Sequence, residues 1–578
     1  MTALDTAVRG RLTKLREQNF ARRLWERDPS LWKAEAEHQR IIRNALGWLS
    51  VPRLMLGELD SLQRFVEEVR AEGYTHAVVL GMGGSSLCPE VCRATFGTAP
   101  GFLNLQVLDS TIPASVAQVE KSLDLLKTRF LLSSKSGGTV EPLSFFAYFF
   151  DLLEKAKGDR AGENFVAVTD PGTALEKLAR EKRFRRVFHG QPDIGGRYSA
   201  LSNFGMVPAA LEGVDVRRLL SRAEEMAGAC APDIPLDRNP AVALGALLGE
   251  AARSGRDKLT FVMSPGIYTF ADWAEQLLAE STGKEGKGLV PVVREYLNAP
   301  ESYGSDRVFI HITLTSELNR TVQKRLESLE AAGHPVVRFE LADPYDLGGE
   351  FFRWEIATAT AGALLGINPF DQPNVQESKD NTNRLLGQYR AQGRFAEDAL
   401  VAEFEGIKIS CPPALYARFQ EKLQMREGMT PAELVAAFLG DGNPRSYVAL
   451  LPYLESSSGH KAAIQVLRLK VRDGLRVATT VGYGPRYLHS TGQLHKGGAA
   501  NGLFILLTAD DRQDLPVPGQ PYTFSVLKQA QALGDYQALA SKGRPVIRFH
   551  LGTAIQTGLD NLASLIKAAL SKLQDIGR

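Results

Sequence analysis

The sequence has few cysteines, almost no net charge and no long apolar run. Its four cysteines, Cys88, Cys92, Cys230 and Cys411, are too few and too scattered for a disulfide framework or a structural zinc site. A formal net charge of +2 provides no electrostatic basis for binding nucleic acid or an anionic membrane. No apolar run approaches the roughly 20 residues of a membrane helix, and the first residues lack the apolar core of a signal peptide. We therefore expect a cytoplasmic protein that binds neither nucleic acid nor membranes.

What the chain does contain is an ordinary globular composition, with 44% hydrophobic and 23% charged residues. Its 578 residues are enough for two to four domains with well-filled cores. Residues 1 to about 70 are rich in Leu, Arg and Glu and have no strand pattern, which predicts a helical N-terminal segment.

From residue 75 onward, short apolar or β-branched runs alternate with turn residues and helical stretches. This alternation is typical of α/β/α three-layer sandwich domains with parallel sheets. Three series of runs occur, at 75–81, 128–134, 164–170 and 185–190, then at 258–264, 307–315 and 335–341, and finally at 446–453, 476–484, 502–510 and 545–551.

A charged stretch that contains Gly and Pro, roughly 380–445, separates the last two series, and its pattern predicts helices. It is the best candidate for a domain boundary. The predicted parts are an N-terminal helical segment, a first and a second α/β domain, and a C-terminal helical and α/β region, at 1–70, 71–230, 231–390 and 391–578.

Two turns rich in glycine and hydroxyl groups follow strands of the first series. The first turn reads GMGGSS (81–86), and the second reads SSKSGGT (133–139). Ligands of open parallel sheets bind at the carboxyl ends of the strands, so turns after neighbouring strands converge on one crevice. The first turn alone is equally compatible with a tight turn that binds nothing. The hydroxyls of the second turn exceed what capping one helix requires, and together the turns favour a phosphate monoester.

Further along the chain, Arg197 lies between a glycine pair and two serines, a setting typical of anion binding. Gln276 and Glu280 share the apolar face of a predicted helix that ends near Gly283, and Thr269 with Asp272 predicts a capping box at its start.

A buried carboxylate at the end of a helix is costly unless it is paired or used. Desolvation of Glu280 would raise its pKa toward the range of a general base. Pairing of Glu280 with Lys284 is the simpler alternative. Lys379 falls on a predicted helix that runs from Gln376 to Leu386, where position alone does not distinguish it from a solvated charge.

In chain order, these motifs resemble those of the phosphoglucose isomerase family, over about residues 75 to 386. The whole chain is similar to the isomerase half of bacterial fused transaldolase/phosphoglucose isomerase proteins. The resemblance implies SIS-type domains, no cofactor and a homodimer, with a monomer as the alternative. The matching stretches are GMGGSS (81–86), SSKSGGTVE (133–141), GGRYSALS (195–202), QLLAESTGKEGKG (276–288) and INPFDQPNVQESK (367–379).

The resemblance also implies the reaction, which interconverts glucose 6-phosphate and fructose 6-phosphate through a cis-enediolate. Proton transfer next to a carbonyl needs a base and a cation that faces the developing oxyanion, and opening the sugar ring needs a second acid–base group. In the family, the base corresponds to Glu280, the cation to Arg197, and the residue that assists ring opening to Lys379. The residues that correspond to its phosphate and sugar contacts are Gly84, Ser85, Ser134, Lys135 through its backbone, Ser136, Thr139 and Gln276.

The ring-opening histidine departs from the family order. Most members carry it between the glutamate and lysine motifs, where this chain offers only His311, in a strand, and His334, in a turn. The matching pattern, HSTGQLHKGG (489–498), comes after the lysine and places His489 on the ring-opening histidine and His495 on a second, substrate-binding one. An ordinary capping or core role for these histidines remains open.

A metal site at this pair is not expected. Histidines six residues apart do not share a helical face, and no Cys, Asp or Glu lies within five residues of either.

Three alternative functions are compatible with part of this set of motifs. A non-catalytic SIS-type sugar-phosphate sensor would keep the phosphate turns without needing Glu280, Arg197 or Lys379, but such sensors usually carry a DNA-binding motif, against which the charge argues. A nucleotide-dependent enzyme fits poorly, because the first turn lacks the third glycine and the acidic ribose partner. Additional activity on mannose 6-phosphate depends on whether Ser281 or Thr282 positions a water, which the sequence leaves open.

Overall fold

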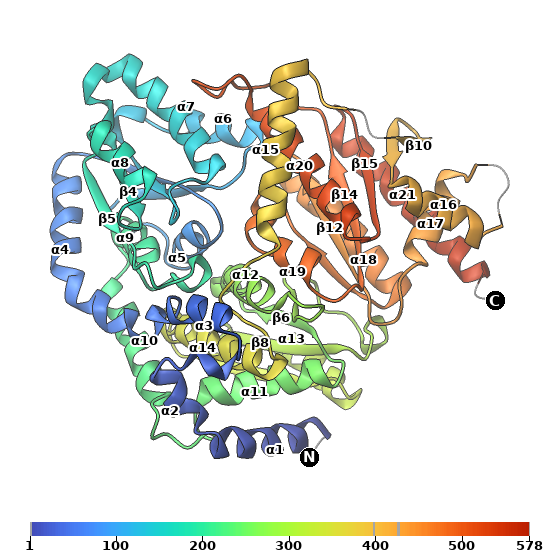
Figure 1. Cartoon of the computed structure of the whole chain (residues 1–578), viewed down its shortest axis with the longest axis horizontal. Coiled ribbons are helices and arrows are strands. Elements are labelled where there is room, and N and C mark those ends of the chain that lie inside the picture. The colour runs from blue at the N-terminus through green and yellow to red at the C-terminus, as the bar shows by residue number, and fades with distance from the viewer. Residues whose placement is uncertain (1–2, 397–398, 425–427, 577–578) are drawn as a thin grey trace.

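The computed structural model describes residues 3–396, 399–424 and 428–576, which form three sheets flanked by helices (Figure 1). The N-terminal segment is helical, as predicted. Its longest helix buries residues spaced three or four apart, which is the pattern of an amphipathic helix lying on a core. These helices are α1 (Ala3–Glu17), α2 (Phe20–Trp25), α3 (Ala36–Arg43) and α4 (Val51–Ala71).

The first unit is a five-stranded parallel sheet with the order β2-β1-β3-β4-β5 and the helices that follow its strands. The central neighbours β1 and β3 end together, because Gly81 lies opposite Ser133 in the register. The two predicted phosphate turns therefore leave the sheet side by side. The elements are β1 (His76–Gly81), α5 (Leu87–Phe96), β2 (Asn104–Leu108), α6 (Pro113–Lys121), β3 (Thr128–Ser133), α7 (Val140–Lys157), β4 (Phe165–Thr169), α8 (Ala174–Glu181), β5 (Arg186–His189), α9 (Asn203–Glu212) and α10 (Val216–Ala229).

The second unit is a four-stranded parallel sheet with the order β7-β6-β8-β9. One continuous apolar core joins it to the N-terminal helices and to the first unit. Its elements are α11 (Pro240–Arg253), β6 (Lys258–Met263), α12 (Phe270–Thr282), β7 (Val290–Val292), β8 (Arg307–Leu314), α13 (Arg320–Ala331), β9 (Val336–Leu341) and α14 (Leu347–Leu365).

The third unit has a separate core and a six-stranded sheet with the order β10-β11-β15-β14-β12-β13. Its last four strands in sequence are parallel, while β10 and β11 form an antiparallel edge. Helix α15 runs beside α20 between this sheet and the first unit (Figure 1). The elements are α15 (Val375–Gln392), β10 (Leu400–Phe404), β11 (Ile407–Ser410), α16 (Pro413–Lys422), α17 (Pro431–Leu439), β12 (Tyr447–Tyr453), α18 (Ser458–Leu475), β13 (Ala478–Val481), α19 (Gly492–Gly497), β14 (Gly502–Thr508), α20 (Phe524–Ser541), β15 (Val546–His550) and α21 (Ile555–Ile576).

The three units share one strand order. Among the parallel strands of each unit, the first in sequence lies between the second and the third, and the fourth follows the third, as in β2-β1-β3-β4, β7-β6-β8-β9 and β13-β12-β14-β15. The architecture is repeated although no repeat of residues is visible in the sequence.

The predicted SIS-type α/β fold with parallel sheets and a helical N-terminal segment is confirmed. The helical prediction for 380–445 is wrong in part, because the hairpin β10–β11 lies inside it. Strand β10 is a short edge strand, and its apolar residues are interrupted by Glu403 within a charged stretch, so they do not stand out as a strand. The strands β2 and β7 are short and were also missed. The domain boundaries remain a prediction.

No helix in the described ranges is long and apolar enough to cross a membrane.

A buried group of charges joins the second and third units. Glu295 is fully buried, 3.1 Å from the guanidinium of Arg307, and it accepts a hydrogen bond from Thr479 at 2.8 Å. Arg468, also buried, lies 4.0 Å from the same carboxylate and donates to the Thr479 carbonyl. One carboxylate thus compensates two buried arginines.

We expect Glu295→Gln to destabilise the protein by about 3 to 5 kcal/mol, because it leaves buried cations without a counterion. Urea unfolding measures the effect. As a matched control, Glu330→Gln removes an exposed ion pair with Arg338 and is expected to change the free energy of unfolding by less than about 1 kcal/mol. Equal effects of both substitutions would contradict the prediction.

Candidate functional site

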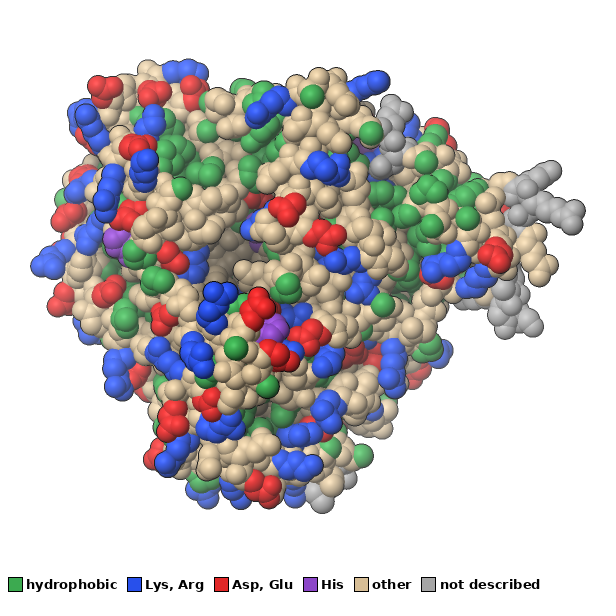
Figure 2. Space-filling model, in the orientation of Figure 1, with side chains coloured by type: hydrophobic (Ala, Val, Ile, Leu, Met, Phe, Trp, Pro, Cys, Tyr) green, Lys and Arg blue, Asp and Glu red, His purple; other side chains and the backbone are tan. Residues whose placement is uncertain are grey.

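A cavity of about 90 Å³ lies where the first unit, α15 and the third unit meet. Figure 2 shows this face of the molecule hollowed near its middle. Five side chains with possible roles in catalysis or binding line the cavity, and they come from segments far apart in the sequence. These are Thr139, Glu141, Lys379, His489 and Gln531.

The second phosphate turn forms the start of helix α7. The hydroxyl of Ser134 donates to that of Thr139 at 3.1 Å, and Gly138 N–H donates to Ser136 at 3.5 Å. The ammonium of Lys135 is directed elsewhere, to Asp170 and to a backbone carbonyl. The hydroxyls and free N–H groups at the start of an 18-residue helix make a suitable anion site. Lys135 would contribute through its backbone, as the family resemblance implies.

The first turn needs its glycines because other site segments touch it. A Cβ on Gly84 would lie 2.0 Å from the carbonyl of Gly196, next to Arg197. Gly83 has a φ of 55°, and a Cβ there would lie 2.8 Å from the carbonyl of His489 and 2.9 Å from the amide of Gln276. Close backbone approach therefore explains both glycines. The neighbouring Ser85 is buried.

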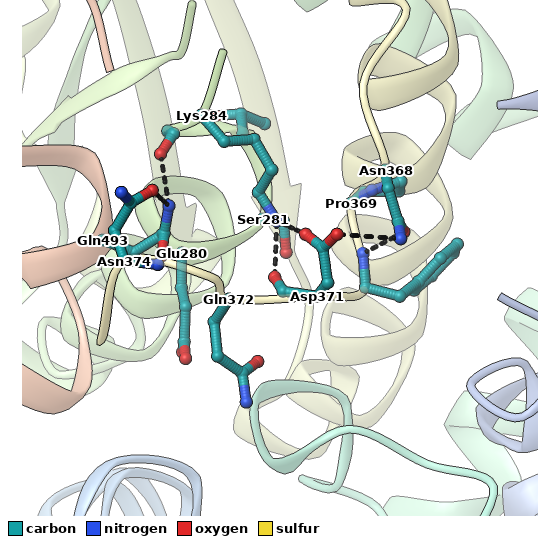
Figure 3. A network of polar contacts seen from close by, with 12 residues as sticks. Glu280, Ser281, Lys284, Asn368, Pro369, Asp371, Gln372, Asn374 and Gln493 are labelled. Carbon is teal, nitrogen blue, oxygen red and sulfur yellow. Dashed lines mark hydrogen bonds and ion pairs between the residues drawn. The ribbon is translucent and has the colours of Figure 1, made fainter. Parts of the chain in front are cut away.

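Glu280 lies on the last turn of α12, where only 7% of the residue is exposed. One carboxylate oxygen is 3.6 Å from the guanidinium of Arg197, and the other accepts from Gln276 at 3.1 Å. A largely desolvated carboxylate thus faces a cation. Figure 3 shows Glu280 beside Gln372 of the turn that precedes α15.

Arg197 is held on several sides and is itself buried, with 2% exposed. Its Nε donates to Ser281 at 2.7 Å, one Nη donates to Gln372 at 2.7 Å, and the other to the Pro369 carbonyl at 2.6 Å. These contacts fix the guanidinium plane while it faces Glu280. The structure thus brings together the stretches GGRYSALS (195–202), QLLAESTGKEGKG (276–288) and INPFDQPNVQESK (367–379).

Lys284 does not pair with Glu280. It binds the carboxylate of Asp371 at 2.7 Å, and Asn368 donates to the other oxygen of that carboxylate at 3.0 Å (Figure 3). Burial lowers the pKa of Lys284 to about 8. The alternative interpretation of Glu280 as the partner of Lys284 is therefore wrong.

The predicted capping box of α12 is also wrong. Thr269 makes no side-chain cap, and Asp272 pairs with Arg294 instead.

His489 lies after β13, and its Nε2 is 2.9 Å from a carboxylate oxygen of Glu141. Its own carbonyl accepts from Gln276 at 2.8 Å, which connects it to the Glu280 helix. Burial raises the pKa of Glu141, but the charge and hydrogen bond of His489 outweigh it, so the pKa lies below the usual value for a carboxyl group. His489 therefore reaches the same cavity as Lys379, despite its late place in the chain.

Sequence reasoning missed the partners of His489. Glu141 ends the motif SSKSGGTVE, and an acidic residue in the first turn of a helix is readily explained by the helix dipole. Gln531, which donates to Glu141 at 2.7 Å, comes from α20 and carries no local signal.

His495 lies in the core of the third unit. The hydroxyl of Tyr447 is 3.0 Å from its Nδ1, and its ring packs against that of Phe504. Burial lowers its pKa to about 3, so the ring is neutral. It is not among the described residues that line the cavity. Its substrate-binding role stays a prediction, and its surroundings favour packing.

Within the described ranges, no group of three or more His, Cys, Asp or Glu residues could hold a metal ion.

The family model and the curated relatives indicate one family. A family model described as phosphoglucose isomerase matches residues 47–304. A glucose-6-phosphate isomerase of Carboxydothermus hydrogenoformans is 31% identical over 409 residues, which cover 60% of this chain and 86% of that protein. One from Symbiobacterium thermophilum is 30% identical over 403 residues, covering 61% and 89%. The solved structure of a hypothetical protein from Thermus thermophilus has a TM-score of 0.55 at 23% identity, covering 66% of this chain and 98% of that one, a likeness of fold alone.

Proposed function

This chain belongs to the phosphoglucose isomerase family. From that premise we propose that it interconverts glucose 6-phosphate and fructose 6-phosphate, with Glu280 as the base and Arg197 as the cation that stabilises the intermediate. The observation that carries the proposal is the buried carboxylate of Glu280, 3.6 Å from the guanidinium of Arg197. Moving a proton between two carbons next to a carbonyl requires such a base and such a cation.

In the proposed reaction, the phosphate binds first and anchors the sugar. Ser85, Ser134, Ser136 and Thr139 supply hydroxyls, with backbone support from Lys135. This group is remote from the reacting carbons, so its binding energy serves to orient them. The two turns leave adjacent strand ends, which supports a single phosphate site.

Ring opening comes next. His489 donates a proton to the ring oxygen as its bond to the anomeric carbon breaks, and the anomeric hydroxyl passes its proton to the side-chain nitrogen of Lys379 and becomes the carbonyl. The carboxylate of Glu141 stabilises the protonated imidazole, since an ionised partner at hydrogen-bond distance favours the charged form. This pair supplies the second acid–base group that the chemistry requires.

Isomerisation then follows on the open chain. Glu280 removes the proton from C2 of the aldose, and the electrons form the enediolate with the negative charge on the C1 oxygen. The hydroxyl proton on the C2 oxygen passes to the C1 oxygen, and the carboxyl group of Glu280 returns its proton to C1 as the C2 oxygen becomes the ketone. Arg197 faces the oxygen on which negative charge develops. Gln276, which hydrogen-bonds to Glu280, orients the base and the sugar.

A coupled assay tests the function. Purified protein receives fructose 6-phosphate, and a dehydrogenase specific for glucose 6-phosphate reports the product. We expect turnover without added metal or cofactor. Binding of the phosphosugar without turnover would favour the non-catalytic sensor instead.

We also propose that one chain holds a complete active site. Every side chain given a role comes from this one chain, with the base on the second unit and the ring-opening histidine on the third. We therefore expect specific activity to stay constant on dilution, because a site shared between copies would lose activity by mass action. Activity that falls on dilution together with dissociation in gel filtration would favour the homodimer.

Finer assignments belong to the same proposal. Similarity to the isomerase half of fused transaldolase/phosphoglucose isomerases is supported by the late position of His489, on a third α/β unit. A cytoplasmic location follows from a charged phosphosugar substrate. The domain limits 71–230, 231–390 and 391–578 are supported by the sheets that fall within them.

Activity on mannose 6-phosphate is not part of the proposal. The hydroxyl of Ser281 accepts from Arg197 and donates to Tyr198, and that of Thr282 donates to the Leu278 carbonyl. Both hydroxyls that were candidates for positioning a water are thus already bonded within the protein.

A further inference from the structure

We propose that two residues on one face of α20, Gln531 and Asp535, are positioning residues that hold the ring-opening pair, His489 and Lys379, in register. The inference rests on the proposed function and deepens it. The two residues are four apart, so they face the same side of the helix. Gln531 is 2% exposed and Asp535 is 1% exposed. Polar side chains are rarely buried to this extent unless they form specific hydrogen bonds or ion pairs.

Gln531 controls the partner of His489. The hydroxyl of Thr111 donates to its amide oxygen at 2.7 Å, and its amide nitrogen donates to Glu141 at 2.7 Å. An ionised carboxylate can only accept, so the amide nitrogen must face Glu141. The oxygen of Glu141 that accepts from Gln531 is the one that bonds His489. Gln531 thereby sets where that oxygen lies and favours its charged form.

Asp535 connects the two members of the pair. One of its oxygens accepts from the hydroxyl of Tyr487 at 2.6 Å, two residues before His489. The other accepts from Ser378 at 3.2 Å, the residue before Lys379. The ammonium of Lys496 lies 2.7 Å from the carboxylate and compensates its negative charge in the interior.

The same helix leaves little freedom for α15 to move. A Cβ on Gly534 would lie 3.1 Å from the hydroxyl of Thr382, so α15 and α20 pack closely at this point. Rigid elements hold reacting groups more precisely than loops do. The third unit therefore does more than supply His489, because α20 also fixes its position relative to Lys379.

Two measurements separate positioning of ring opening from general support of the fold. Exchange between the anomers of fructose 6-phosphate, followed by NMR above the uncatalysed rate, reports ring opening alone. The primary isotope effect on kcat/KM with glucose 6-phosphate deuterated at C2 reports how far proton transfer limits the rate. We expect Gln531→Met and Asp535→Asn to slow anomer exchange by about 10- to 100-fold and to bring the isotope effect toward one.

Gln531→Glu is a second test that preserves side-chain size. It places another carboxyl group beside Glu141, which raises the pKa of the coupled acid–base group and moves the kcat/KM profile to higher pH. Gln537→Met is the matched control, since Gln537 lies on the same helix and bonds Arg384 instead. We expect it to leave both measurements unchanged.

The proposal is overturned if the variants at 531 and 535 slow anomer exchange and isomerisation equally with an unchanged isotope effect, or if Gln531→Glu leaves the pH profile in place. Failure of the proposed function would look different, because the wild-type protein itself would then show no isomerisation.

Discussion

Glu280→Gln is expected to lower kcat by about 10⁴-fold, at the upper end of what a general base contributes, because Glu280 serves both carbons. The amide keeps the shape of the side chain but cannot take a proton from C2. The direct measurement is NMR of the substrate in deuterium oxide, in which exchange of the C2 proton should cease. Anomer exchange should persist, since ring opening uses other groups.

The matched control for this variant is Glu275→Gln, five residues earlier on the same helix. Burial raises the pKa of Glu275 to about 8, so its carboxyl group is mostly protonated at neutral pH. Replacing it by an amide changes little charge, and we expect kcat within a few-fold of the wild type. Retention of C2 exchange by Glu280→Gln would remove Glu280 from the role of base.

The second large effect is expected from His489→Ala, with a loss of about 10²- to 10³-fold on the cyclic substrate. Without the imidazole, no acid at this position can protonate the ring oxygen. A tetrose 4-phosphate has no free hydroxyl that can close a five- or six-membered ring. Its C2 proton exchange should therefore be far less affected, and equal loss on both substrates would refute the ring-opening role.

Two further variants complete this test. His460→Ala removes a histidine from the surface side of the same unit, where it bonds the Glu455 carbonyl, and is expected to leave both rates unchanged. Glu141→Gln should reproduce the selective loss in weaker form, because it removes the anion that stabilises the imidazolium. Since the pKa of Glu141 lies below the usual carboxyl value, its carboxylate is present throughout the neutral range. The substitution therefore removes an anion that a change of pH within that range would leave in place.

Much of the fold and part of the candidate site could be predicted from local pattern. Apolar runs of four to eight residues marked most strands, and the glycine-rich turns marked where the first unit ends its central strands. The helical spacing of Gln276 and Glu280 correctly placed both on one buried face of α12. Such features repeat over a few residues, so a short window contains the whole signal.

The predictions that failed concerned exposed edges and choice of partner. Strand β10 is five residues long, lies on the edge of its sheet and contains Glu403 within a charged stretch, so its apolar residues did not indicate a strand. Lys284 stands four residues after Glu280, yet it bonds Asp371 from a distant turn. The spacing of residues along a helix shows which side chains can contact each other within that helix. It does not show whether a side chain from a distant segment will bind one of them instead.

The sequence alone therefore settled the class of fold, the motifs and the kinds of groups available, because these depend on neighbours along the chain. Only the tertiary structure decided that His489, late in the chain, bonds Glu141 and shares a cavity with Lys379. The tertiary structure also decided that α20 contacts Glu141 and the start of α15 through Gln531 and Asp535. These arrangements depend on how the three sheets and their helices pack against one another. Contacts between residues hundreds of positions apart leave no periodicity in the sequence.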